Sequence, residues 1–265
     1  PKANTYPKLD EKGDPHPKAG QVAFQDDPDY CPVFMGSEMR SLFTSSEGRL
    51  IVGHDASGLE LRMLAHYMED QEYINAILTG DIHTLNQEAA GLPSRDAAKT
   101  FIYAFLYGAG NEKIGSIVGG NERDGAALKR SFLAATPSLD KLIRNVKRAS
   151  KKGWLRGLDN RRIMMRYSNG RVMEHKALNT LLQCGGAVVM KKSMILLDRW
   201  VEEEGLDVLK VVDMHDEAQA DVLKKDVKRY SELAELSIVK AGEYFDLAIP
   251  MAADVKVGLN WAETH

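Results

Sequence analysis

Two aspartates stand where hydrophobic strands would hold their carboxylates rigidly. Asp55 follows Leu50-Ile51-Val52, and Asp216 follows the run Val211-Val212-Asp213-Met214-His215. Two such carboxylates can hold a pair of Mg²⁺ ions about 3.5–4 Å apart, an arrangement that polarises an attacking hydroxyl and stabilises a leaving phosphate. A single aspartate at a strand end more often caps a turn. The spacing of the two along the chain leaves open whether they meet.

A second candidate site is a stripe of polar side chains along one expected helix. Arg95, Lys99, Tyr103 and Tyr107 recur at intervals of four in a segment from Ser94 to Tyr107 that ends at Gly108-Ala109-Gly110. At about 1.5 Å per residue the stripe is roughly 18 Å long. Cations near a helix N-terminus attract phosphates, and the rings beyond them can cover a base. The stripe suits a nucleoside triphosphate, but a solvated cationic face with tyrosines packed on a core fits it equally well.

The elements that would position these residues mix helices and strands without regular alternation. A strand at Arg49–Val52 is expected to leave sharply through Gly53-His54-Asp55 into a helix over 57–68. Strands 208–213 and 217–222 form a hairpin whose turn carries His215-Asp216. The other expected elements are helical residues 72–91, a helical region 122–152 broken at Pro137, a basic strand-prone segment 154–173, helices 177–203 and 226–244, and a strand near 252–257. This order predicts an α+β fold.

Composition indicates an ordinary soluble protein. The hydrophobic fraction is 44% and the charged fraction 28%. We expect no apolar run near the length of about 20 residues that crosses a bilayer, no signal peptide and no membrane partner, which favours a cytoplasmic location. Cys31 and Cys184 lie far apart and are expected to be reduced thiols.

The charge distribution favours nucleic acid as a partner. The net charge of −3 by itself argues weakly against it. Between Ile143 and Lys176, however, eleven basic residues stand against two acids, a local net charge of +9. Trp154 and Tyr167 lie among them, as suits a surface that follows phosphates and packs against sugars.

Three segments resemble the motifs of family A DNA polymerases, specifically the phage replicative branch related to bacterial DNA polymerase I. Asp55-Ala56-Ser57-Gly58-Leu59-Glu60-Leu61-Arg62 resembles motif A, the segment 95–108 resembles motif B on the fingers helix, and His215-Asp216-Glu217 resembles motif C. Asp81-Ile82-His83-Thr84, the segment 177–183, and Asn260-Trp261-Ala262 with His265 match as well. The resemblance covers about residue 33 to the end.

The resemblance implies a role for each matching residue in template-directed addition of dNTPs to a primer. Asp55, Asp216 and the backbone carbonyl of Ala56 would hold two Mg²⁺ ions. Lys99 would protonate the leaving pyrophosphate, and Glu60 would exclude a ribose 2′-hydroxyl. Substrate-binding residues would be Arg95, Lys99, His83, Tyr103, Tyr107 and Glu60, and residues touching primer-template DNA would be Gln183, Asn179, His175 and His215. Taken alone, Glu60 would serve its helix dipole and His83 would be a capped or core histidine.

The resemblance also implies a division into palm and fingers. We expect an extended remnant over 1–40, palm over 41–70 with motif A, fingers over 71–150 with the motif B helix at 94–107, and palm over 151–265 with the hairpin 208–222. The palm would be an antiparallel sheet with packed helices. Closure of the fingers helix around a correct base pair would supply fidelity.

Two departures from the family pattern concern the N-terminal end. Related enzymes carry an exonuclease and a thumb before this region, and neither fits into the roughly 30 residues here. The segment 16–22 faintly matches a His-Pro-x-x-x-Gln element, but Lys12-Gly13 replaces the usual Gly-Arg and Lys18 the usual Asn. A shortened piece of a longer protein, a split gene whose second chain supplies the thumb and exonuclease, and a degenerate gene would each explain these departures.

The function expected from the resemblance is DNA synthesis in an infected bacterial cell. Two other hypotheses of function stay open. One is a non-catalytic or weakly active DNA-binding fragment that assembles with a partner chain. The other is a single-subunit RNA polymerase, which Glu60 in its Leu-Glu-Leu-Arg context disfavours.

Overall fold

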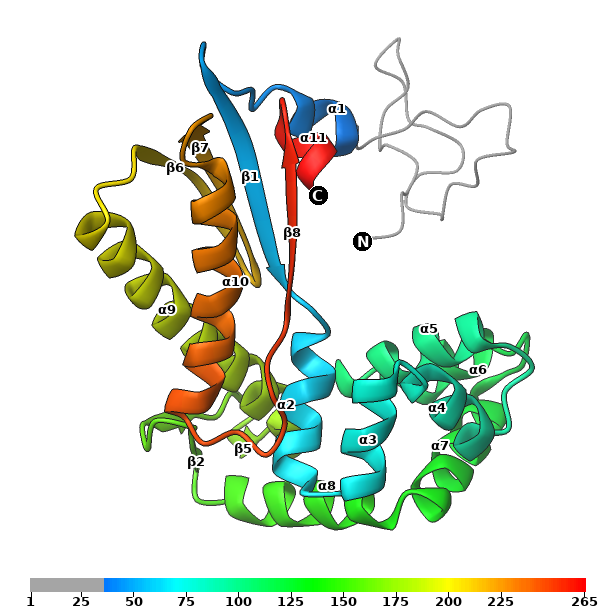
Figure 1. Cartoon of the computed structure of the whole chain (residues 1–265). Coiled ribbons are helices and arrows are strands. Elements are labelled where there is room, and N and C mark those ends of the chain that lie inside the picture. Colours follow the sequence, from blue (N-terminus) through cyan, green and yellow to red (C-terminus); the bar gives the residue numbers. More distant parts are fainter. Residues whose placement is uncertain (1–35) are drawn as a thin grey trace, which may run out of the picture.

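An antiparallel sheet of four strands forms one part of the molecule, as seen in a computed structural model that describes residues 36–265 (Figure 1). The strand order is β6-β7-β1-β8, and every neighbouring pair is antiparallel. The strands are β1 (Arg49–Ala56), β6 (Val208–Met214), β7 (Glu217–Leu223) and β8 (Ala253–Gly258). The fold is therefore α+β with an antiparallel sheet, as the sequence predicts.

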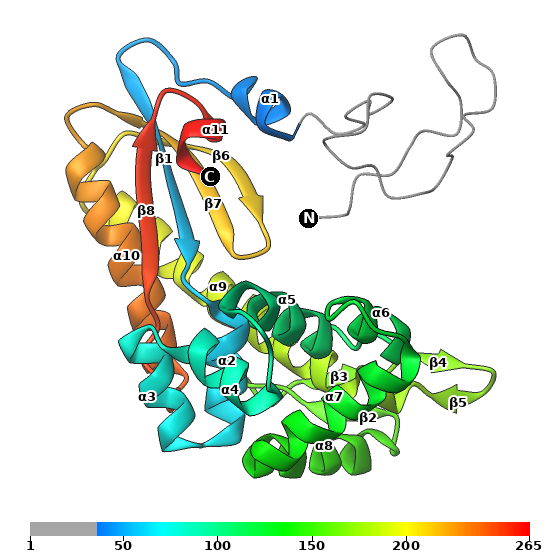
Figure 2. The ribbon, with the colours of Figure 1, turned by 90° about the vertical axis from the view of Figure 1, so that its right-hand side faces the viewer.

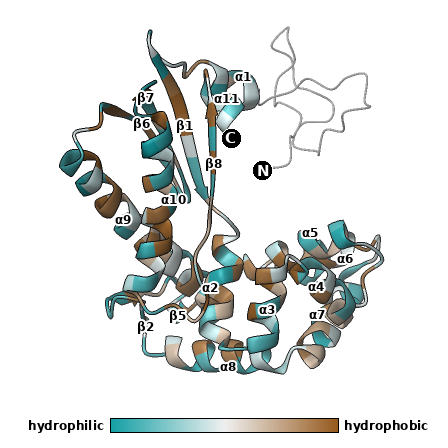
Figure 3. Cartoon of the chain, viewed as in Figure 1, coloured by the Kyte–Doolittle hydropathy of each residue, from teal (hydrophilic) through white to brown (hydrophobic). Residues whose placement is uncertain are grey.

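Two long helices, α9 (Ala177–Glu203) and α10 (Val227–Tyr244), pack together beside this sheet (Figure 1). Between them and the sheet lies a small core built on Val52, Leu197, Ala220, Val222 and Tyr230. Val52 of β1 lies opposite Ala220 of β7, so both strands give alternate residues to this core. The hydrophobic stretches of β1 and α9 stand out in Figure 3.

The helical part of the chain lies at the far end of β1 and β8 (Figures 1 and 2). Its helices are α2 (Leu59–Met68), α3 (Gln71–Thr79), α4 (Ile82–Ala90), α5 (Arg95–Leu106), α6 (Asn111–Ser116), α7 (Glu122–Ala135) and α8 (Pro137–Ser150). Phe101 of α5 meets Phe132 of α7 edge to face, with ring centroids 5.0 Å apart. Both rings are fully buried in the largest core cluster, so α5 has one face fixed and the opposite face available.

Short elements complete the described residues. They are α1 (Gly36–Ser41), β2 (Trp154–Arg156), β3 (Arg162–Met164), β4 (Tyr167–Ser168), β5 (Arg171–Val172), the 3₁₀ turn η1 (Glu174–Lys176) and α11 (Trp261–Thr264). β2 pairs with β3 and β4 with β5, which agrees with the strand-prone basic segment.

Four expectations about the elements were wrong in detail. The first strand continues through Asp55 to Ala56, because β7 and β8 both pair with it over that length. Residues 72–91 form two helices, because Gly80 takes a left-handed conformation and its N–H caps α3. Residues 36–41 are helical, whereas the rest of the expected extended remnant, with the segment 16–22 and Cys31, lies outside the described residues.

The fourth concerns hydrophobicity. The continuous helical stretch Glu174–Glu203 is long and apolar enough to cross a membrane by length and composition. Half of its most apolar window is buried inside the structure, where α9 packs against α10 and α2. Its apolar character is accounted for by that packing.

Candidate active site

Three carboxylates form a row across three neighbouring strands, at the end of the sheet where β1 leads into α2. Asp55 of β1 lies directly opposite Glu217 of β7 on one side and Asp254 of β8 on the other. Directly opposite residues of antiparallel strands point to the same face. The sequence directs attention to Asp55 and to motif C, but it gives no reason to single out Asp254.

Asp216 joins this row from the hairpin turn. The backbone N–H of Ala56 donates to the carbonyl of Asp216 over 3.0 Å, which ties the end of β1 to the turn. Asp55, Asp216, Glu217 and Asp254 line one pocket of about 310 Å³ together with Lys256, Thr264 and His265. The two aspartates that stand 161 positions apart in the sequence are thus brought together.

Burial and crowded negative charge raise the pKa values of Asp55 and Asp216. Partial burial, and then the charges of Asp216, Glu217 and Asp254, raise the pKa of Asp55 to about 6. Burial also raises the pKa of Asp216, with further contributions from Glu60 and Glu217. Carboxylates held together in this way gain from a cation that shares them.

Glu217 is held in place by its own partners. The side chains of Trp261, Gln219 and His265 contact its two oxygens, Gln219 at 2.6 Å and His265 at 2.8 Å. Trp261 and His265 belong to the C-terminal segment that contains α11. Both carboxylate oxygens of Glu217 are therefore occupied by contacts within the protein, whereas the side chain of Asp55 is exposed at the pocket.

Helix α5 carries the predicted stripe. Arg95 and Lys99 are exposed in its first two turns, Tyr103 is half-buried, and Tyr107 follows the last turn. Burial raises the pKa of Tyr103, and the charges of Glu60, Asp216 and Asp55 add to the shift, so its hydroxyl lies within electrostatic reach of these carboxylates. Ser94 caps the helix through its hydroxyl, which accepts from the N–H of Ala97 at 3.1 Å.

His83 lies on α4 beside the cationic end of this stripe. Burial lowers its pKa, and the charges of Arg95 and Lys99 lower it further. Its Nδ1 is buried without a partner among the described residues. The histidine therefore belongs to the same cluster as the two cations.

Glu60 is part of a polar cluster at the other end of the stripe. The Tyr107 hydroxyl donates to Glu60 over 2.8 Å, and Gln183 of α9 lies 3.4 Å from the same hydroxyl. Burial and this bond raise the pKa of Tyr107 to about 12. Glu60, Tyr107, Gln183, His215 and Asp216 line a pocket of about 340 Å³ beside the carboxylates. The expectation that Glu60 serves only its helix dipole misses this cluster.

The remaining predicted residues lie on the side of α9 that leads to the basic segment. Asn179 is one turn before Gln183 on the same face of α9. His175 in η1 is exposed and lines a shallow pocket with Lys151, Tyr167 and Arg171. Nearby, Lys152 and Arg162 both lie over the ring of Trp154, so the basic segment does present cations and aromatic rings together.

Oxygen ligands suited to Mg²⁺ are present, but they are few. Among the described residues, no three histidine, cysteine or acidic side chains are arranged to hold a metal ion by themselves. Mg²⁺ is usually held by one or two carboxylates together with waters and substrate phosphates. Asp55 and Asp216 fit that pattern, because they share a pocket and repel one another.

The sheet of this order, with a cation-bearing helix beside its acidic row, has the fold of a solved polymerase domain. The solved POL domain of Pol1 from M. smegmatis, in complex with DNA primer-template and dNTP, has the same fold with a TM-score of 0.76. The match covers 86% of this chain and 43% of that one, at 22% identity.

The chain belongs to the DNA polymerase family A, whose family model matches residues 31–263. It is 46% identical over 245 residues to a DNA-directed DNA polymerase of Escherichia phage Phieco32, covering 82% of this chain and 40% of the relative. It is 37% identical over 260 residues to that of Escherichia phage T7, covering 89% and 36%. The chain thus spans about two fifths of the length of these relatives.

Proposed function

We propose that this chain carries out template-directed DNA synthesis, adding dNTPs to the 3′-hydroxyl of a primer. The observation that carries the proposal is the convergence of Asp55 and Asp216 in one pocket, with the Tyr103 hydroxyl of α5 within electrostatic reach of both. Family membership and the phage relatives support the same activity.

The acidic pocket would bind the metal ions. The carboxylates of Asp55 and Asp216 and the backbone carbonyl of Ala56 would hold two Mg²⁺ ions, a pair that lowers the pKa of an attacking hydroxyl and neutralises developing phosphate charge. Glu217 and Asp254 would keep the local potential negative without leaving their own partners.

The stripe on α5 would bind the incoming nucleotide. Arg95, Lys99 and His83 would hold the triphosphate, and Lys99 would protonate the pyrophosphate as it leaves. Tyr103 would stack near the new sugar and base, and Tyr107 near the templating position. Glu60, held beside the carboxylates by Tyr107, would occupy the place that a ribose 2′-hydroxyl would need.

The polar face of α9 and the hairpin turn would contact DNA. Gln183, Asn179 and His175 lead from the active site towards the basic segment, where primer-template would lie. His215 in the turn would sit by the primer terminus. In this assignment the sheet with α9 and α10 is the palm, residues 71–150 form the fingers, and 41–70 and 151–265 belong to the palm.

The rest of the machinery is proposed to come from outside this stretch of sequence. The relatives are about two and a half times longer, and we propose that a thumb and an exonuclease come either from further sequence of the same protein or from a second chain. We propose that the protein works in the cytoplasm of an infected bacterial host, as its phage relatives suggest.

Primer extension with Mg²⁺ tests the proposal directly. We expect Asp216→Ala to abolish incorporation while the circular dichroism spectrum and melting temperature stay close to those of the parent. The matched control is Glu235→Gln, an exposed acid on α10, which should extend primers normally. Full activity of Asp216→Ala would exclude the metal assignment, and a preference for rNTPs would point to RNA synthesis. Tight binding of primer-template without extension in the presence of any divalent metal ion would support the alternative of a non-catalytic DNA-binding fragment.

A further inference from the structure

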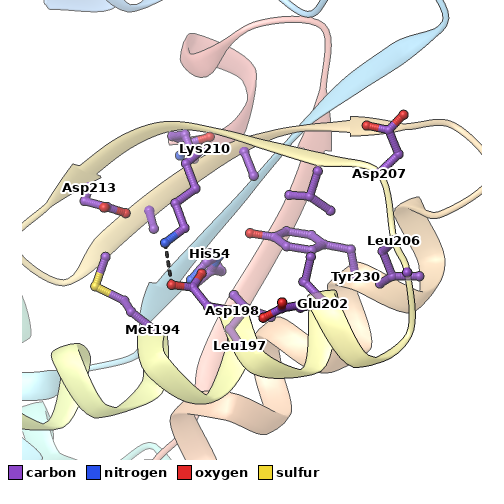
Figure 4. Close-up of a pocket in the computed structure, with 16 residues that line it drawn as sticks. His54, Met194, Leu197, Asp198, Glu202, Leu206, Asp207, Lys210, Asp213 and Tyr230 are labelled. Carbon is purple, nitrogen blue, oxygen red and sulfur yellow. Dashed lines mark hydrogen bonds and ion pairs between the residues drawn. The ribbon is translucent and has the colours of Figure 1, made fainter.

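Another pocket, of about 480 Å³, opens on the face of the sheet opposite the acidic row of Asp55, Glu217 and Asp254. Figure 4 shows the side chains that line it. It lies between α9 and the strands β6, β7 and β1. Successive residues of a strand point to opposite faces, so His54 faces this pocket while Asp55 faces the acidic row. The two pockets therefore lie on opposite sides of the same strand.

Small residues and an irregularity in β6 shape this pocket. Ala218 and Ala220 of β7 face α9 and leave room that larger side chains would fill. The pairing of β6 with β7 shifts between Lys210 and Val212, which turns Asp213 to the pocket side. Apolar side chains that complete the walls are Met194, Leu197, Val201, Leu206, Val208 and Tyr230.

His54 places an unsatisfied polar group in this apolar pocket. Its side chain is 2% exposed, and neither ring nitrogen has a partner among the described residues. The ring meets Tyr230 edge-on, with centroids 6.4 Å apart. Buried polar atoms nearly always have a hydrogen-bond partner, and an imidazole carries at least one N–H. A ligand with a polar edge would supply that partner once the side chains that cover the ring move aside.

The mouth of the pocket carries an excess of negative charge. Asp198, Glu202, Asp207 and Asp213 line it against one cation, Lys210. Lys210 pairs with Asp198 at 2.5 Å, and Asp207 pairs with Arg49 at 2.8 Å. Within residues 36–265, this leaves Glu202 and Asp213 without an ion-pair partner. Such a mouth attracts cations and repels nucleotides and other anions.

We propose that this pocket is a binding site for a flat heteroaromatic cation of small-molecule size. The apolar walls would cover its rings, a ring nitrogen or amino group would bond His54, and its charge would face Glu202 and Asp213. The volume falls within the range of about 300–1,000 Å³ that is usual for small-molecule sites. This site is independent of the proposed nucleotide site, because each opens on a different face of the sheet.

Fluorescence titration of the DNA-free protein with 9-aminoacridine, a planar cation at pH 7.5, tests the site. We expect saturable binding that weakens about tenfold in the double variant Glu202→Gln/Asp213→Asn, because two exposed attractive charges are lost. Ala218→Leu should abolish binding by filling the pocket, and His54→Phe should weaken it severalfold. The anionic dye 1-anilinonaphthalene-8-sulfonate should bind at least tenfold more weakly than the cation.

Two control variants identify the site that the dye occupies. Glu235→Gln removes an exposed acid of α10 outside the pocket, and Asp55→Asn removes charge from the acidic row on the other face. Both should leave the affinity unchanged. The proposal is overturned if Asp55→Asn weakens binding as much as the double variant does, if the double variant binds within twofold of the parent, or if the anionic dye binds as tightly. The double variant alters exposed side chains, so its test stands even if Ala218→Leu does not fold.

Discussion

Replacing Asp55 by asparagine should stabilise the metal-free protein while removing its activity. Asp55 lies between Glu217 and Asp254 in the sheet and shares a pocket with Asp216, so its charge is held against three others. Like charges directly opposite each other across strands are destabilising. Asparagine keeps the shape and removes the charge, so the cost of partly burying that charge disappears together with the repulsion.

The magnitude follows from the acidity of Asp55. Its pKa is raised from 3.8 to about 6, and a shift of about two units corresponds to about 3 kcal/mol. This value is an upper limit on the gain in unfolding free energy. Because the Asp55 side chain is exposed at the pocket, solvent screening reduces the expected gain to about 1 kcal/mol. A change of this size shifts the melting temperature of a chain of this length by about 2–4 °C.

The pH dependence gives the prediction its sign. Below the unfolded pKa both states hold the proton, so the carboxyl costs no stability there. As the pH rises through the folded pKa of about 6, the native state must give up the proton, and the cost becomes complete. The gain of Asp55→Asn over the parent should therefore be full at pH 7.5 and should shrink towards zero as the pH falls to about 4.

Thermal melts in EDTA between pH 8 and pH 4.5 measure this gain. Glu235→Gln, which removes an exposed acid outside the row, should show no comparable pH-dependent gain. Added Mg²⁺ should raise the melting temperature of the parent more than that of the variant, since only the parent retains both aspartates. A variant that melts below the parent at pH 7.5 in EDTA, or one whose gain is the same at every pH, would refute the charge argument.

Three further outcomes are expected. In single-nucleotide extension, Glu60→Ala should raise ribonucleotide incorporation relative to deoxynucleotide incorporation by about tenfold or more. Tyr107→Phe removes the hydroxyl that donates to Glu60 over 2.8 Å and should raise the same ratio by about threefold. Unchanged sugar selectivity in both variants would show that Glu60 does not exclude the ribose 2′-hydroxyl. Lys99→Ala should lower the rate of the chemical step by about 10²–10³-fold in rapid-quench kinetics, as for loss of a general acid, and a change confined to nucleotide affinity would argue for binding alone. Gly125→Ala should cost about 2–3 kcal/mol in urea unfolding, because its Cβ would lie 1.9 Å from the carbonyl oxygen of Asn111, whereas Gly110→Ala, with no atom within 4 Å, should change stability little; equal effects of the two would contradict the packing of α6 on α7.

Sequence patterns predict those helices and turns that are determined by residues close together in the chain. The stripe on α5 follows from the helical period, and the break at Pro137 separates α7 from α8 as expected. The hairpin of β6 and β7 follows from two strand-forming runs around a two-residue turn, where His215 adopts a positive φ of 57°. Residues near each other in the chain determine these features, so their types and spacing are enough.

Partners distant in the chain were decided only by the tertiary structure. The row of Asp254, Asp55 and Glu217 depends on the registers of β8 and β7 against β1, and a shift of one residue would send each side chain to the other face. The bond between Tyr107 and Glu60 joins helices 47 residues apart, and the pocket at His54 exists because Ala218 and Ala220 face α9. The sequence by itself determined the family, the α+β class and the catalytic candidates, because those follow from motifs and local periodicity. Long-range strand pairing and packing decide which acids share a pocket, and they also form the pocket at His54 on the opposite face of the sheet. No local sequence pattern encodes that pairing or packing.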